Sequence, residues 1–410
     1  MNKNKIFLGV DIGSSCIKAV AGKYDKSTQS IELVSYGIGQ NTGIEYGYIK
    51  NMNQAVNALR SAINQLSEAI DMDNITSVIC NISGTDLFST NARGLLAFKE
   101  SKKIDDNILE ELDDNSISSV AKENKSVVFL TNKSYNIDDG EDIHDPFGLE
   151  VNRIEADNFI LYADNDHITN IRKLFSNVGI KITDIIPDAI AASEVLIKQS
   201  ERDMGISVLD IGYTKTDIAI FTEGNIQHNK VIPNGIKDII HMISYVYKLS
   251  FEDACYVYNE YANLLKCNSD EEVSLGIDYL GKERFLHIGE FNRLIEDLIK
   301  QLLARISNII TNEGYSNRIL SGYVLTGGLT KLRGAKNAIG NVVGQSKIKV
   351  GRLYGTVGCN SISDDGSFSS AIGMLKLAIS DSENEQHSVL NVISDFFSGI
   401  FDKIISKQEK

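Results

Sequence analysis

The sequence predicts a globular α/β protein that is built from two related halves and ends in an amphipathic helix. One pattern occurs twice, as IFLGVDIGSSCIKAVA at 6–21 and ISVLDIGYTKTDIAIF at 206–221. Each copy reads as an apolar strand that ends in Asp-Ile-Gly, a polar turn and a second strand. The chain has 410 residues, 42% of them hydrophobic. At roughly 100–200 residues per domain it can form several domains, each with a substantial core.

Composition excludes several classes of protein. The 41 Lys and Arg against 55 Asp and Glu leave a formal charge of −14, so we expect no binding to nucleic acid. The five Cys are scattered, without C-x-x-C spacing, which disfavours disulfide frameworks and zinc sites and fits a reducing cytoplasm. No apolar run reaches the roughly 18 residues of a membrane-spanning helix.

The repeated turns predict a phosphate site. Glycines at Gly13 and Gly212 permit positive φ, and turns of this kind present successive backbone N–H groups to an anion. Asp11 and Asp210 would end the two strands and hold Mg²⁺ through water. One Asp-x-Gly turn alone is ordinary turn chemistry, but two in matching strand contexts predict a clamp for a polyphosphate. The side chains that we place beside these turns are Ser14, Ser15, Lys18, Tyr213, Thr214 and Lys215.

A third element, YVLTGGLTKLRG at 323–334, reads as a strand, a Gly-Gly turn and the start of a helix. Gly327 and Gly328 lack Cβ atoms, so an adenine-sized ring can lie flat against their backbone.

The three elements, in this order, resemble the phosphate and adenosine motifs of the actin/Hsp70/sugar-kinase ATPase superfamily. Within it, ISGTDLFSTNARG at 82–94, DPFGLEVNRIEAD at 145–157 and IKVGRL at 348–353 resemble the FtsA family of bacterial cell-division proteins. The resemblance implies a two-lobed actin-like fold with duplicated mixed-sheet cores and an FtsA-type inserted α+β subdomain. It also implies connecting helices that start at Pro187 and contain Ala371 to Gly373.

The resemblance divides the chain as follows. The first lobe takes 1–83, 165–203 and 364–378; the inserted subdomain 84–164; the base of the second lobe 204–232 and 322–363; its upper subdomain 233–321; a flexible linker 379–388; and an amphipathic membrane-targeting helix 389–407.

The resemblance implies ATP with Mg²⁺ as the ligand and adds Gly235 and Leu329 to the candidate nucleotide-binding residues. The second phosphate turn departs from the common pattern. Relatives often carry Gly-Gly-Gly-Thr where this chain has Gly212-Tyr213-Thr214-Lys215. Ile236 stands where a second Gly is common, and Ile240 stands where a polar residue usually contacts the nucleotide. We expect ATP binding with at most slow hydrolysis, and no catalytic residue can be named. The Lys215 ammonium either contacts phosphate or points to solvent.

The final segment, VLNVISDFFSGIFDKIISK, has one strongly apolar helical face. Such a helix docks on its own core, on a partner helix or on a membrane interface. The polar segment before it and the resemblance to FtsA favour a membrane anchor. Its lipid-facing residues would be Val389, Ile393, Phe396, Phe397, Ile400, Phe401 and Ile404.

Partner surfaces come from the resemblance. The FtsA family binds the C-terminal tail of the tubulin-like protein FtsZ, for which Arg293 and Lys300 are candidates; a solvated helix face explains Lys300 equally well. FtsA protomers self-associate through the inserted subdomain, where Asn91 and Arg93 match the family; a structural ion pair is the alternative for Arg93. The acidic run from Asp105 to Asp114 reads as a solvated helix face.

Together these features predict a peripheral protein of the cytoplasmic face of the membrane at the division site. It would bind ATP, polymerise, tether FtsZ filaments to lipid and help to assemble other division proteins. The alternatives are a PilM-like actin-fold scaffold of a pilus or secretion machine, or a metabolite kinase. A kinase would need a carboxylate base between the lobes, and none is recognisable in the sequence.

Overall fold

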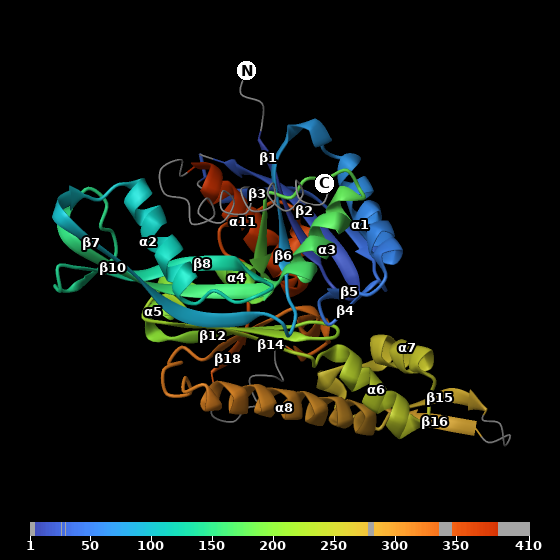
Figure 1. The fold of residues 1–410 in the computed structure, drawn as a ribbon. Coiled ribbons are helices and arrows are strands. Elements are labelled where there is room, and N and C mark those ends of the chain that lie inside the picture. The colour runs from blue at the N-terminus through green and yellow to red at the C-terminus, as the bar shows by residue number, and fades with distance from the viewer. Residues whose placement is uncertain (1–4, 26, 29, 278–282, 336–346, 384–410) are drawn as a thin grey trace.

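The computed structural model describes residues 5–25, 27–28, 30–277, 283–335 and 347–383. Two mixed sheets form its centre (Figure 1). The first sheet has the order β11-β6-β1-β2-β3-β19 and the second has the order β14-β13-β12-β17-β18. The strands of the first sheet are β1 Ile6–Ile12, β2 Cys16–Asp25, β3 Ser30–Gln40, β6 Ile75–Ile82, β11 Asp184–Pro187 and β19 Thr356–Val357. Those of the second are β12 Ile206–Ile211, β13 Thr216–Thr222, β14 Asn225–Ile232, β17 Tyr323–Thr326 and β18 Ile348–Val350.

The predicted duplication is confirmed by the pairing of the strands. In the first sheet β1 is antiparallel to β2 and parallel to β6. In the second sheet β12 is antiparallel to β13 and parallel to β17. Asp11 and Asp210 therefore occupy equivalent positions near the carboxyl ends of β1 and β12, paired across the ladder with Lys18 and Asp217 respectively.

Two helices, α4 (Asp188–Leu196) and α11 (Ser369–Glu383), lie between the sheets and contact each other along much of their length. Their approach depends on missing side chains. A Cβ at Gly373 would lie 1.8 Å from the carbonyl oxygen of Ala191 on α4. A Cβ at Gly9 would lie 1.9 Å from the carbonyl oxygen of Ala371 on α11. Glycine at these two positions lets α11 pack directly on β1 and on α4.

Further helices cover the outer faces of the sheets. Alternate residues of β12 serve two cores: Val208 packs with α4 and α11, whereas Leu209 and Ile211 pack in the second core with α6 and α8. Figure 1 shows α8 running along the second sheet. The remaining elements are α1 Met52–Ser67 and α3 Asn165–Ser176 of the first lobe, with the short β4 Ile44–Glu45 and β5 Tyr48–Ile49. The second lobe adds α5 Gln199–Met204, α6 Ile236–Tyr247, α7 Phe251–Tyr261, α8 Ile288–Asn312 and the hairpin of β15 Glu272–Ile277 and β16 Glu283–His287.

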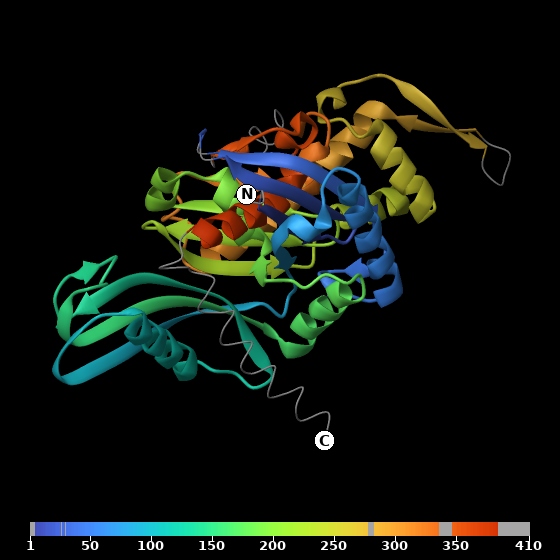
Figure 2. The same ribbon diagram turned by 90° about the horizontal axis from the view of Figure 1, so that it is seen from above.

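An α+β subdomain projects from the first lobe (Figure 2). Its sheet has the order β7-β10-β8-β9, packed against one helix. The elements are β7 Phe88–Lys103, α2 Asp106–Ser119, β8 Lys125–Ile137, β9 Asp142–Ile143 and β10 Glu150–Asp164.

Asp86 joins both ends of this subdomain to the first lobe. Its carboxylate accepts hydrogen bonds from the backbone N–H of Asp164 at 3.1 Å and from the hydroxyl of Tyr48 at 3.0 Å. It also pairs with the buried His167 on α3, at 3.0 Å from Nδ1. These contacts hold the pKa of Asp86 below its usual value, although burial acts in the opposite direction. The ISGTDLF part of the signature at 82–94 therefore anchors the base of the subdomain.

The subdomain also contacts the second lobe. β7 and β10 lie against β14, where the Ser89 hydroxyl bonds the backbone of Asn229, donating to its oxygen at 3.2 Å. The amide of Asn225 donates to the backbone oxygen of Lys133 at 3.3 Å.

Four expectations need correction. The predicted linker at 379–388 begins too early, because α11 continues to Glu383 and Ile379 is packed in the core. The chain returns to the first lobe before 364, because β19 pairs with β3. The residues directly after the Gly-Gly turn form a 3₁₀ turn, η3 Gly328–Lys331, rather than the first turn of an α-helix. Asp113, in the acidic run, is buried rather than solvated.

The amphipathic helix predicted at 389–407, with its lipid-facing residues, lies outside the described residues. Within the described part of the chain, no helix is both long enough and apolar enough to cross a bilayer.

Candidate functional site

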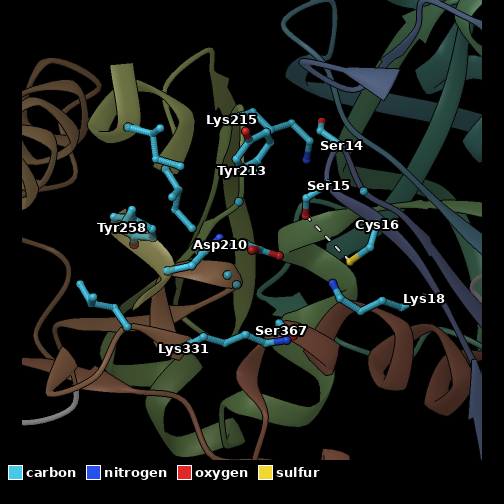
Figure 3. Close-up of a pocket in the computed structure, with 18 of the residues that line it drawn as sticks. Ser14, Ser15, Cys16, Lys18, Asp210, Tyr213, Lys215, Tyr258, Lys331 and Ser367 are labelled. Atoms are coloured by element: carbon cyan, nitrogen blue, oxygen red, sulfur yellow. Dashed lines mark hydrogen bonds between the residues drawn. The ribbon is translucent and has the colours of Figure 1, made fainter. Parts of the chain in front are cut away.

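A cavity of about 460 Å³ lies between the two sheets and collects residues from all three predicted elements (Figure 3). Asp11 and Asp210 both line it, although they are far apart in the sequence. Of the predicted residues, the cavity is lined by Asp11, Gly13, Ser14, Ser15, Lys18, Asp210, Gly212, Tyr213, Lys215, Gly327 and Gly328.

Three predicted residues stand just behind the cavity wall. Thr214 is buried. Leu329 is fully buried in the second core. Gly235 packs against the second turn, where a Cβ would lie 2.6 Å from the carbonyl oxygens of both Gly212 and Tyr213. These residues support the lining rather than forming it.

The two turns touch each other directly. The hydroxyls of Ser14 and Thr214 lie 2.7 Å apart, and Thr214 also accepts a hydrogen bond from the backbone N–H of Tyr46 at 3.0 Å. The predicted positive φ is wrong for both turn glycines, because neither Gly13 nor Gly212 adopts it. Gly13 is required for space instead, since a Cβ there would lie 2.8 Å from the carbonyl oxygen of Cys16.

Positive φ occurs at the third element. Gly327 has φ +83°, and a Cβ would meet Asp210 Oδ1 at 2.2 Å. Only glycine fits this backbone without displacing the carboxylate of β12. The Gly-Gly turn therefore positions Asp210 as well as opening the wall beside it.

Buried charges form the floor of the cavity. Lys18 Nζ lies 2.9 Å from Asp11 Oδ2. Lys215 Nζ lies 2.6 Å from both Asp188 Oδ2 and Asp217 Oδ2. The Lys215 ammonium therefore does not point to solvent, because it is buried and held by two carboxylates, and its contact with phosphate stays a prediction.

The pKa values of these groups follow from burial and charge. Burial opposes the charge on Lys18 and Lys215, but their carboxylate partners outweigh it and hold both pKa values above the usual range. Burial raises the pKa of Asp188 and of Asp210, and nearby carboxylates, Asp217 among them, add to the rise. The floor thus carries more carboxylates than ammonium groups, and a cation bound there would relieve their repulsion.

Two further polar residues hold the carboxylates in place. Asn81, at the end of β6, donates to Asp11 Oδ1 at 3.1 Å and to Asp188 Oδ1 at 2.6 Å, and accepts from the backbone N–H of Ile12 at 2.7 Å. The Ser370 hydroxyl donates to Asp210 Oδ2 at 3.0 Å. Sequence reasoning missed Asn81 and Asp188. An Asn inside the apolar strand ICNI, and an Asp directly after Pro187, were the available signals.

The second-lobe side of the cavity is largely apolar. Ile236 and Ile240 of α6 line it, as do Tyr258 and Ala262 at the end of α7, together with Gly328. An apolar wall beside a bare glycine backbone suits a flat aromatic ring. The lining residues that the sequence did not indicate are Cys16, Asp188, Cys255, Tyr258, Asn259, Ala262, Lys331, Leu332, Arg333 and Ser367.

The candidate partner residues lie away from the cavity. Arg293 is exposed on α8, and its Nε donates to the carbonyl of Gly289 in the same helix at 3.3 Å. Lys300 pairs with Glu296 at 3.2 Å and Asp297 at 3.4 Å on that helix, as a solvated face would show. Asn91 and Arg93 are exposed on β7. Arg93 forms no ion pair with any residue that the structure describes, which is contrary to the structural alternative.

Comparison with known proteins agrees with the motifs. The model of the family "Cell division protein FtsA" matches residues 207–373. The chain is 25% identical to cell division protein FtsA of Pseudomonas aeruginosa, over 92% of this chain and 89% of that protein. It is 24% identical to FtsA of Escherichia coli, over 90% of each chain. It is also 24% identical to FtsA of Bacillus subtilis, over 85% of this chain and 79% of that one.

The resemblance to FtsA is confirmed. Solved structures show that the fold of this FtsA-like chain is actin-like. It superimposes on the PilM–PilN type IV pilus biogenesis complex with a TM-score of 0.63 at 13% identity, covering 92% of this chain and 98% of that one. It superimposes on MreB5 of Spiroplasma citri bound to ADP with a TM-score of 0.54 at 15% identity, covering 93% of this chain and 98% of the MreB5 chain.

Proposed function

We propose that this protein is an actin-like cell-division protein that binds ATP with Mg²⁺ in the cavity between its lobes. The observation that carries the proposal is the meeting of Asp11, Asp210 and the Gly-Gly turn around one cavity. The relatives named cell division protein FtsA support the role in division. The solved MreB5 structures bound to ADP and AMPPNP support nucleotide as the ligand.

The residues fit such a ligand. The backbone N–H groups of the two turns would hold the phosphates, with Ser14 and Ser15 as hydroxyl donors. Asp11 and Asp210 would hold the Mg²⁺ through water, and the ion would neutralise charge on the phosphates. The apolar wall at Ile236 and Ile240 would take the base.

We expect slow or negligible turnover. The Lys215 ammonium is already bound by Asp188 and Asp217, and the second turn lacks the usual run of glycines. Calorimetry with MgATP and a sensitive phosphate-release assay test the two parts separately. Absence of binding at millimolar MgATP would reject the ligand, and rapid phosphate release would reject the slow turnover.

The wider role is a membrane tether. We propose that the protein polymerises through the inserted subdomain, with Asn91 and Arg93 at the contact. It would bind the C-terminal tail of FtsZ through Arg293, with Lys300 as a weaker candidate, and hold FtsZ filaments and other division proteins at the cytoplasmic face of the membrane.

The segment 389–407 would be the membrane anchor. In this segment and the three residues after it, the positive charges of Lys403, Lys407 and Lys410 are balanced by the negative charges of Asp395, Asp402 and Glu409. Burial of apolar side chains must therefore supply the free energy of membrane binding. Co-sedimentation with anionic and neutral liposomes, comparing the full chain with residues 1–386, tests this. We expect the full chain alone to pellet, with little dependence on salt; equal pelleting of both would exclude the anchor. Repeating the assay with FtsZ tests the tether.

The PilM-like alternative has less support. Similarity to the PilM–PilN complex, at 13% identity, shows the fold alone. The curated relatives that match most of the chain are named FtsA. A screen of small phosphoryl acceptors with MgATP tests the kinase alternative.

A further inference from the structure

Three serines, Ser367, Ser369 and Ser370, lie where the chain enters α11, and they differ in their partners. Ser369 lies 2.7 Å from the Thr326 hydroxyl, and Ser370 donates to Asp210. Ser367 is only 6% exposed, and its hydroxyl has no hydrogen-bond partner among the described residues. Yet Ser367 lines the cavity between the lobes (Figure 3). A buried hydroxyl without a partner is costly, so its presence on a cavity wall indicates a ligand that completes it.

Lys331 brings a positive charge to the same wall. Its Nζ lies 3.1 Å from Asp365 Oδ2, and Asp365 Oδ1 accepts the backbone N–H of Ser367 at 2.9 Å. The Lys331 ammonium also lies 5.9 Å from the centre of the Phe368 ring. One carboxylate thus bridges the Lys331 ammonium and the Ser367 backbone, so the two residues are neighbours in space.

The Lys331 ammonium is more available than the lysines of the cavity floor. Lys18 and Lys215 are buried and held by carboxylates. The Lys331 side chain is 53% exposed, and the Asp365 carboxylate can occupy only part of its donor capacity. An incoming anion can therefore bind Lys331 without breaking a buried ion pair.

We propose that Ser367 and Lys331 form a phosphate-binding station on the α11 side of the cavity, separate from both glycine turns. The Ser367 hydroxyl donates to a phosphate oxygen of the nucleotide, and the Lys331 ammonium supplies a charge-assisted contact to the same group. A hydroxyl donor next to an ammonium group is better suited to binding a phosphate oxygen than to binding the adenine ring. This inference rests on the proposed nucleotide binding and adds two residues that the sequence analysis did not assign to it.

Calorimetry with MgADP, AMP and adenosine tests the station in the full-length protein. We expect Lys331→Met to weaken MgADP and AMP roughly tenfold, and Ser367→Ala to weaken them roughly fivefold. The affinity for adenosine, measured by competition with MgADP, should be the same for the wild type and all variants. Lys266→Met is the matched control, because Lys266 is a similarly exposed lysine paired with one carboxylate, Glu271, at 2.8 Å.

Stability without ligand separates a binding role from a structural one. Ser367→Ala removes a hydroxyl that has no partner among the described residues, so the unfolding temperature of this variant without nucleotide should equal or exceed that of the wild type. A lower unfolding temperature would show a structural role and overturn the assignment.

The possible failures are distinguishable. If the wild type binds none of the three ligands, the proposed function fails and the station with it. If the wild type binds MgADP and both variants match it, only the station fails. If the variants lose adenosine as strongly as MgADP, the contact is to the nucleoside and the phosphate assignment is wrong.

Discussion

Asp113 provides a sharp test of the reasoning about buried charge. This carboxyl lies inside the inserted subdomain, where Asp113 Oδ1 accepts hydrogen bonds from Asn132 at 2.9 Å and Asn158 at 3.0 Å. Burial raises its pKa from 3.8 to about 6, despite these two hydrogen bonds. The native state therefore holds a proton over a pH range in which the unfolded state has released it.

The sign and size of the effect follow from linkage. Because the native state binds more protons, stability falls as pH rises between the two pKa values. At about 1.4 kcal/mol for each unit of pKa difference, the subdomain loses at most about 3 kcal/mol between about pH 4 and pH 6. In Asp113→Asn the amide oxygen can accept both hydrogen bonds and nothing titrates, so this part of the pH dependence should disappear.

Hydrogen exchange is the appropriate assay, because it reports opening of the subdomain separately from the rest of the chain. Exchange in α2, β8 and β10 should accelerate from about pH 4 to pH 7 in the wild type, after correction for intrinsic rates, and much less in Asp113→Asn. Glu111→Gln, at an exposed position on the same helix, is the control and should follow the wild type. Parallel profiles for Asp113→Asn and the wild type would refute the reasoning.

Three further predictions concern the cavity, the helix crossing and the partner surface. Asp188 and Asp210 have raised pKa values, so both carboxylates gain protons as pH falls from about 8 to about 6. Over this range the affinity for MgADP should fall, whereas the affinity for ADP in EDTA should rise. Calorimetry that finds the same pH trend for MgADP and for metal-free ADP would contradict this. Gly373→Ala should destabilise the protein by about 1–3 kcal/mol or more through its clash with α4, measured by thermal unfolding against Ser380→Ala; an unchanged unfolding temperature would contradict the close crossing. Arg293→Glu should weaken capture of an FtsZ tail peptide roughly fivefold in fluorescence anisotropy, with Arg60→Glu, at an exposed Arg of α1 on the first lobe, as control; equal affinities would remove Arg293 from the site.

Much of the fold could be predicted from local pattern. Repeated strand-turn-strand segments specify two similar hairpins. The approach of Asp11 and Asp210 followed from treating the repeats as equivalent halves. The hairpins could be predicted because they depend on neighbours in the sequence, whereas the meeting of the two Asp residues could be predicted because the strand-turn-strand pattern is repeated.

The failures concern interactions between distant segments. The pairing of β19 with β3 depends on where the chain crosses back between the lobes, and a strand of two residues carries almost no pattern. Asp113 looks solvated within an acidic run, but the amides of Asn132 on β8 and Asn158 on β10 donate hydrogen bonds to it and so compensate its burial. The backbone of Gly13 was misjudged because glycine permits several conformations, and packing against Cys16 decides among them.

The inserted subdomain has two attachments, and they are to different lobes. Asp86 fastens its root to the first lobe, while Ser89 rests against Asn229 on β14 of the second. If the separation of the lobes changed, the end of the subdomain at Asp86 would move with the first lobe. The contact of Ser89 with β14 would then shift along the second lobe. A small change in the distance between the lobes would therefore rotate the subdomain and displace its far end by more than the cavity walls move.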